Sequence, residues 1–209
     1  MPKFKEMPYK EKYEKALEGI EFMKSMVQPF IKMHLTDNAI KELQKTWDEG
    51  LKPIPEAGSF KEKYETAYSN YIWVDKSAYN FIRKEIGKDG IEKFKNVEIE
   101  GLKQKNAGPA TTFLGMVRRI APGYAFLMTS KEFSYQLQWL TPFTVSEMNK
   151  QKTVFDIPRC KILDFKKTGE LSRIGCQSIY PTWAADQFKV KMTSERNGRS
   201  CKCILTPIA

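Results

Sequence analysis

This chain of 209 residues has a single histidine, only four cysteines and no long apolar run. A membrane-spanning helix needs roughly 18 to 20 apolar residues in succession, and no stretch approaches that length. The first residues, MPKFKEMPYKEKYEKALEG, are charged throughout and lack the apolar core of a secretory signal peptide. We therefore expect a cytoplasmic protein with no membrane partner. In that compartment its cysteines would be thiols, metal ligands or redox groups rather than structural disulfides.

Several motifs of common enzymes are also missing. The chain has no G-x-S-x-G, no G-x-x-x-x-G-K-[ST], no G-x-G-x-x-G after a strand and no H-E-x-x-H. These absences argue against a nucleotide-driven enzyme, a Rossmann dehydrogenase and a metalloprotease. A Ser-His-Asp triad would have to use His34, which lies at the end of a predicted helix, where a structural or surface role is the expectation.

What the sequence does have is an uneven positive charge. The net charge is +10, and 41% of the residues are hydrophobic and 29% charged, as in ordinary globular proteins. Residues 1–108 carry 20 basic and 18 acidic side chains, whereas residues 109–209 carry 15 and 7. The basic second half favours a small anionic ligand, an acidic partner or nucleic acid, or is simply a lysine-rich surface. Nucleic acid is not the expected partner because no recognised reading motif is present. An oligomer or a complex partner remains open.

The first half of the sequence reads as almost wholly helical. Apolar residues recur at spacings of three and four over 9–34, and again over 37–47. Ser59 followed by Glu62 predicts a capping box for a helix over 60–73, and Asp75 reads as the start of the next helix, which would end at Gly87. A helix over 111–121, with Pro109 near its first turn, is expected to end at Pro122–Gly123. Residues 124–140 are ambiguous, with a helix favoured in their second half.

The second half predicts two hairpins with helices around them. FTVSEM and TVFDIPRC read as two strands joined by NKQK, and KVKMTS and RSCKCILTPI as two more joined by ERNG. The stretch between the hairpins reads as helical with a break near Pro181. We therefore expect an α+β fold, with a helical region over 1–108 and a region with a small antiparallel sheet over 109–209, the two forming one compact unit.

The four cysteines are the first candidate functional residues. On an extended strand Cys201 and Cys203 point to the same face. Cys160 ends a strand and Cys176 opens a helical stretch, so the fold could gather all four. Three interpretations stay open: core packing, a reactive or redox thiol near Arg159, Lys161 and Arg173, or a zinc or iron–sulfur site. The separations of 16 and 25 residues and the final C-x-C are not those of an ordinary zinc ribbon.

Candidate ligand-binding residues lie near these cysteines. Tyr180, Trp183 and Phe188 follow Cys176 and would line a small-molecule pocket, or pack the helix on the sheet. The pair Arg118–Arg119 could hold a carboxylate with two hydrogen bonds, or lie in solvent.

The second half also resembles a known family. The segments FDIPRCKIL, SRIGCQSIYPTWAADQF and NGRSCKCILTPI are similar to those of the L-2-amino-thiazoline-4-carboxylic acid hydrolase-like family, and of the related small-molecule-binding domains named after 4-vinyl reductase. The resemblance covers 109–209. Cys160, Cys176 and Cys201 match the recurrent cysteines. The chain departs from the family in its doubled final cysteine, Cys203, and in Arg199, where an acidic residue often stands.

The resemblance implies hydrolysis of a C–N bond in a small carboxylated sulfur heterocycle. Cys176 would then be the nucleophile and Cys160 a second catalytic thiol, Arg159 or Arg173 would hold the carboxylate, and Asp186 or a bound water would act as base. The alternative is a non-catalytic module that binds a small molecule, or binds a metal or cluster through Cys160, Cys176, Cys201 and Cys203. Such a module could also be an accessory subunit of a redox complex.

Overall fold

The computed structural model describes residues 5–164, 171 and 173–208. The chain divides into two compact units, one formed by residues 7–98 and the other by residues 1–6 together with 99–209. The division falls inside the fourth helix, whereas the composition changes about ten residues later, after Gly108. We call them the helical unit and the sheet unit, and each is described by itself.

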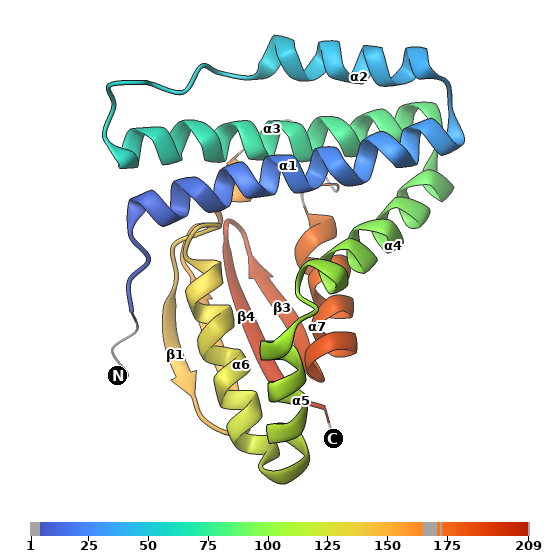
Figure 1. The fold of residues 1–209 in the computed structure, drawn as a ribbon. Coiled ribbons are helices and arrows are strands. Elements are labelled where there is room, and N and C mark those ends of the chain that lie inside the picture. The colour runs from blue at the N-terminus through green and yellow to red at the C-terminus, as the bar shows by residue number, and fades with distance from the viewer. Residues whose placement is uncertain (1–4, 165–170, 172, 209) are drawn as a thin grey trace. The chain divides into compact units, whose positions relative to one another are not determined.

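The helical unit contains α1 (Tyr9–His34), α2 (Asp37–Gly50), α3 (Phe60–Glu85) and the first part of α4 (Lys88–Lys105). Helix α1 lies alongside α3 (Figure 1). The predicted spacing is confirmed in α1, whose buried residues are Ala16, Ile20, Met23, Val27, Phe30 and Ile31. The core is completed by aromatic side chains, with Phe94 packed against Phe30 at 5.2 Å and against Tyr79 at 5.3 Å between ring centroids.

The start of α3 is the predicted capping box. The Glu62 backbone N–H donates to Ser59 Oγ at 3.3 Å, and the Ser59 N–H donates to Glu62 Oε2 at 2.8 Å. The expected helix start at Asp75 is wrong, because α3 runs through it without a break. No glycine or proline interrupts the segment, and the Asp75 carboxylate pairs with Lys76 Nζ at 3.1 Å instead of capping a new helix.

The sheet unit begins with three helical segments: the end of α4, then α5 (Pro109–Ile120) and α6 (Pro122–Leu137). Pro122 ends α5 as predicted and also stands at the first position of α6, where the missing N–H costs nothing. Residues 124–137 are therefore all helical, including the half for which the sequence favoured no assignment.

The four strands are β1 (Thr144–Met148), β2 (Thr153–Ile157), β3 (Val190–Asn197) and β4 (Ser200–Pro207). They form one antiparallel sheet in the order β1-β2-β4-β3, so the two predicted hairpins are joined through β2 and β4. The α+β class predicted from the sequence is confirmed. The β3–β4 turn needs Gly198, whose φ of 59° lies in the left-handed region.

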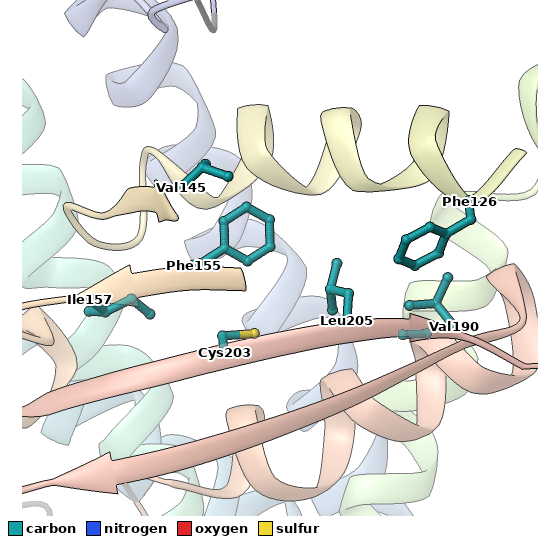
Figure 2. Close-up of a cluster of buried hydrophobic side chains, with 8 residues drawn as sticks. Phe126, Val145, Phe155, Ile157, Val190, Cys203 and Leu205 are labelled. Atoms are coloured by element: carbon teal, nitrogen blue, oxygen red, sulfur yellow. The ribbon is translucent and has the colours of Figure 1, made fainter. Parts of the chain in front are cut away.

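One face of this sheet carries the core of the unit. Phe126 from α6 and Ala184 from α7 (Tyr180–Phe188) reach the same cluster, so both helices cover that face. Figure 2 shows the strand residues of this cluster, which point toward one another beneath α6. Phe133 of α6 contacts Trp183 and Phe188 of α7, with ring centroids 5.6 and 6.1 Å apart.

The segment before α7 differs from the sequence prediction. A short 3-10 helix, η1 (Lys161–Asp164), follows the sheet, and a π-helical turn, η3 (Gly175–Ile179), runs directly into α7. Pro181 lies in the first turn of α7, so the helix is not broken there. Because Pro181 has no N–H to donate, the α-helical hydrogen bonds before it are incomplete. The π-helical turn lies at that point. Residues 165–170 and 172, part of the same predicted stretch, lie outside the described residues.

Within the described part of the chain, no helix combines the length and the apolar character needed to cross a bilayer.

Candidate thiol site

The pairing of β2 with β4 positions two of the four cysteines. Cys203 lies opposite Phe155 and Cys201 opposite Ile157, so the two thiols share the core face, as their spacing predicts. Cys203 is only 5% exposed and points into the hydrophobic cluster (Figure 2). Cys201 is half-buried at the edge of the same cluster. The C-x-C spacing therefore gives one sealed and one accessible thiol.

Cys160 is held at the same end of the sheet. Its backbone N–H donates to the carbonyl of Arg199 at 3.0 Å, which ties the segment after β2 to the turn before β4. The Cys160 side chain is half-buried and packs against the same core cluster as Cys201. Two thiols that are far apart in the sequence are thus brought to one edge of the core.

Cys176 comes from the helical side of the unit. It is the second residue of η3, near the start of a continuous helical stretch over 174–188. Its thiol donates to the carbonyl of Arg173 at 3.4 Å, which fixes the direction of the side chain. The backbone N–H groups at the start of a helix carry partial positive charge, which favours an anion at this position.

Burial dominates the electrostatics of the two strand thiols. Burial, with smaller contributions from negative charge on Cys201 and Cys176, raises the pKa of Cys203 to about 12. Burial is also the main reason that the pKa of Cys201 is raised, with charge on Cys160 second. Cys160 and Cys201 both pack against the cluster that contains Cys203. Cys203 is poorly suited to act as a nucleophile.

The thiols are near one another without forming a ligand cage. Among the described residues, which include all four cysteines, no group of three or more His, Cys, Asp or Glu side chains is arranged to hold a metal ion. A tetrahedral zinc site needs four ligand atoms within about 2.3 Å of one centre, and a cluster needs similar convergence. The residues therefore do not fit zinc or an iron–sulfur cluster in this arrangement.

Arg173, three residues before Cys176, is the most notable polar group of the site. Arg173 is half-buried, and its Nε is fully buried with no hydrogen-bond partner in the part of the chain that the structure describes. A buried donor without an acceptor is costly, so an oxygen ligand at this point would be favourable. Arg159, the other predicted carboxylate binder, is exposed, and its carbonyl accepts a hydrogen bond from Thr141 Oγ1 at 3.3 Å.

Of the three predicted aromatic residues, Tyr180 has surroundings different from those of Trp183 and Phe188, which pack on one another. The ring of Tyr180 lies against Gly175, where an added Cβ would stand 3.1 Å from Tyr180 Cε2. Tyr180 is therefore one helical turn from Cys176 and half-buried. Trp183 packs against Phe133 and Phe188 and donates its indole N–H to Gln187. This geometry uses Trp183 to pack α7 on α6.

The other predicted site residues are not placed beside Cys176. Asp186 follows it by ten residues, which is about 15 Å along a helix at the α-helical rise, and its carboxylate pairs with Lys103 Nζ at 2.7 Å. Lys103, which the sequence analysis did not single out, is also held by Glu100 at 2.7 Å. Arg118 lies in the last turn of α5, a helix that packs mainly on α6.

His34 belongs to the helical unit. Its Nδ1 lies 2.9 Å from the Phe30 carbonyl one turn earlier, and its ring packs on Phe30. Two shallow hollows also lie in the helical unit. One is lined by α2 residues from Ile40 to Glu49 and the other by α1 residues from Ser25 to Lys32 with Ile40. They are surface hollows between solvated helices and contain none of the cysteines.

Searches of protein-family models, of curated proteins and of solved structures found no match to this chain.

Proposed function

We propose that the sheet unit is a thiol-dependent hydrolase of the L-2-amino-thiazoline-4-carboxylic acid hydrolase-like type, acting on a C–N bond of a small carboxylated heterocycle. The observations that carry this proposal are two nearby residues: Cys176, near the start of a helical stretch, and Arg173, whose buried Nε has no partner among the described residues. The Cys176 thiol donates its proton to the Arg173 carbonyl and must release it before attack, and the Arg173 Nε is a donor that calls for an anion.

Arg173 would bind the carboxylate of the substrate. A guanidinium presents parallel N–H donors that match the two carboxylate oxygens, and a partly desolvated site strengthens the interaction. The ligand would then satisfy the Nε donor, for which the described residues provide no acceptor. The excess of basic side chains over 109–209 would attract the same anion from solution.

Cys176 would supply the sulfur that attacks the amidine carbon. The carbon–sulfur bond forms, and the C–N bond breaks as the nitrogen takes up a proton. Water then adds to the same carbon, the bond to Cys176 breaks and the thiol is regenerated, so that one water is consumed in each cycle. Because Asp186 is paired with Lys103, a water molecule would carry the proton. Tyr180 would line the substrate-binding site beside η3, the turn that carries Cys176.

The experiment uses the full chain with 2-amino-thiazoline-4-carboxylate and follows its loss by chromatography. Cys176→Ser should reduce kcat at least about a hundredfold, because a hydroxyl is a far weaker nucleophile than a thiol. Arg173→Gln should mainly raise KM, by about tenfold or more, because it removes the charge that binds the carboxylate. Arg83→Gln, an exposed arginine of α3, is the matched control and should change neither constant. Full turnover by Cys176→Ser would refute the thiol mechanism.

The alternative is a module that binds a small anion without reacting with it. It is favoured by the lack of a general base, since the single histidine lies in the helical unit and Asp186 is held by Lys103. Calorimetry would then detect binding of the same compound, lost in Arg173→Gln, while no turnover occurs. Metal analysis and a visible spectrum of protein purified without oxygen test the cluster version. A stoichiometric metal that is lost in Cys201→Ser would overturn the hydrolase proposal.

A further inference from the structure

Exposed apolar side chains gather on α5 and on the first turns of α6. In α5 they recur at spacings of three and four, so they lie on one side of the helix, and Leu114 is the buried residue of α5. Ile120 is 87% exposed, and Phe113 and Met116 are slightly more than half exposed. Figure 1 shows α5 lying beside α6. We call the exposed residues the α5 face: Phe113, Met116, Ile120, Tyr124 and Met128.

The charge around the α5 face is predominantly positive. Residues 101–131 contain no aspartate or glutamate and carry five basic side chains, of which Lys103 is paired with Glu100 and Asp186. The other four are Lys105, Arg118, Arg119 and Lys131, and the exposed Glu132 follows them. Arg119 and Lys131 are exposed. Lys150, from the turn between β1 and β2, adds a further positive charge, because its Nζ lies 3.7 Å from the centre of the Tyr124 ring. The surface is therefore apolar with a positive border.

This charge distribution discriminates among possible occupants. In a two-fold dimer the same patch meets itself, so the arginines and lysines of one copy would face those of the other. A protein partner would need pockets for its anchor residues, whereas the α5 face consists of protruding side chains and the two hollows described above lie in the helical unit. A surface that is apolar inside and negative at its boundary matches both features, and an anionic membrane has that structure.

We propose that the α5 face docks the chain reversibly on an anionic lipid surface. Phe113, Met116 and Ile120 enter the interface between head groups and acyl chains, and Arg119 and Lys131 reach the lipid phosphates. A twelve-residue helix with so few apolar side chains lies on the surface and does not cross it. The length of apolar runs, on which a membrane partner was excluded above, bears only on spanning segments. The proposal is independent of the thiol chemistry.

The test is cosedimentation of the full chain with vesicles of phosphatidylcholine containing phosphatidylserine, compared with vesicles of phosphatidylcholine alone. Binding to the anionic vesicles is expected at low salt and should weaken as salt is raised. Arg119→Gln should weaken binding about fivefold, the fold-change that corresponds to about 1 kcal/mol for one basic side chain near such a surface. Ile120→Ser should weaken it by at least as much, because it removes an apolar side chain from the interface. Met33→Ser removes an apolar side chain that is 80% exposed on α1 and is the matched control, with no change expected.

The variants alter exposed side chains, so each should keep the circular dichroism spectrum of the parent. Failure to bind anionic vesicles at low salt would overturn the proposal, as would binding that Ile120→Ser and Arg119→Gln leave unchanged. Binding to polyglutamate without binding to vesicles would assign the face to an acidic protein. Dimerisation in light scattering that is lost in Ile120→Ser, again without vesicle binding, would assign it to a second copy. Both results would also overturn the proposal.

Discussion

The two units bury different kinds of side chain. The helical unit places ionisable groups in its interior, with Lys76 and Glu98 both less than a tenth exposed. The sheet unit places a thiol, Cys203, in its core and keeps its described arginines and lysines exposed or half-exposed. The interior of the helical unit should therefore respond to pH, whereas the interior thiol of the sheet unit should stay protected from thiol reagents until the unit unfolds. This difference shows that the two halves can be probed separately within one chain.

The buried ionisable side chains of the helical unit belong to a network of four residues. Burial, followed by the charge of Asp75, raises the pKa of Glu98 from 4.5 to about 8. The hydroxyl of Tyr79 donates to Glu98 Oε2 at 2.6 Å and, with the charge of Lys76, opposes that shift. Lys76 is itself paired with Asp75. Each residue provides a hydrogen bond or an opposite charge to another residue of the network. Such partners allow charged groups to be buried away from water.

The largest expected effect tests whether the sheet unit depends on its apolar cluster. Phe155→Ala should lower the free energy of unfolding by about 3–5 kcal/mol, because it removes a fully buried ring and leaves a cavity. Urea unfolding followed by circular dichroism measures the change. Phe113→Ala is the matched control, since Phe113 is half exposed, and it should shift stability by less than about 0.5 kcal/mol. A loss below about 1 kcal/mol for Phe155→Ala would mean that the cluster is not the core.

The next effect sharpens the contrast between sealed and accessible thiols. At about pH 8 iodoacetamide should modify Cys203 at least a hundredfold more slowly than the half-buried Cys160, Cys176 and Cys201, because only the thiolate reacts and burial raises the pKa of Cys203 to about 12. Mass spectrometry of peptides at timed intervals gives the four rates. In urea the four cysteines should react alike. Equal rates in the folded protein would contradict the burial of Cys203.

The third prediction concerns the pH response of the helical unit. The pKa of Glu98 is higher folded than unfolded, so the folded chain holds a proton that the unfolded chain releases, and stability falls as pH rises from about 4.5 to about 8. Glu98→Gln removes this titration. The gap in free energy of unfolding between variant and parent should therefore grow by about 1 kcal/mol or more, in favour of the variant, as the pH rises over that range. Urea unfolding at a series of pH values measures the gap. Glu65→Gln, at an exposed position of α3, should give a constant gap. A constant gap for Glu98→Gln would show that Glu98 is not protonated in the fold.

The smallest effect tests the helix start that the sequence predicted. Ser59→Ala should destabilise the helical unit by about 1 kcal/mol, because it removes the side-chain acceptor for the Glu62 N–H. Thr36→Ala is a matched control at the N-cap of α2, where the side chain makes no capping hydrogen bond, and it should change stability by a few tenths of that amount. Equal losses of stability at the two positions would mean that the hydrogen bonds of the capping box do not stabilise the helical unit. Thermal unfolding of both variants gives the comparison.

Local patterns in the sequence predicted much of the fold. The spacing of apolar residues predicted α1, and the Ser59–Glu62 pair predicted the start of α3. Alternation predicted the four strands and the shared face of Cys201 and Cys203. The local rules failed where a residue type has two uses. Asp75 can cap a helix or form an ion pair, and a buried ion pair with Lys76 leaves α3 unbroken.

The candidate site was predicted only in part. The sequence indicated which cysteines and arginines to consider, but not that Asp186 is held by Lys103 or that Trp183 is used in packing. Both facts depend on contacts between α7 and helices that precede it by many residues. The π-helical turn around Cys176 was also missed, because its only local indications are Gly175 and Pro181, which equally suit a helix end.

The amino-acid sequence by itself determined the helical first half, the two hairpins and the positive charge of the second half, because these depend on periodicity and composition along the chain. Only the tertiary structure decided that β2 pairs with β4, that Cys160 and Cys201 meet at one edge of the core, and that Glu98 is buried against Tyr79. Pairing and burial depend on which distant surfaces fit together, and no local pattern encodes the partner.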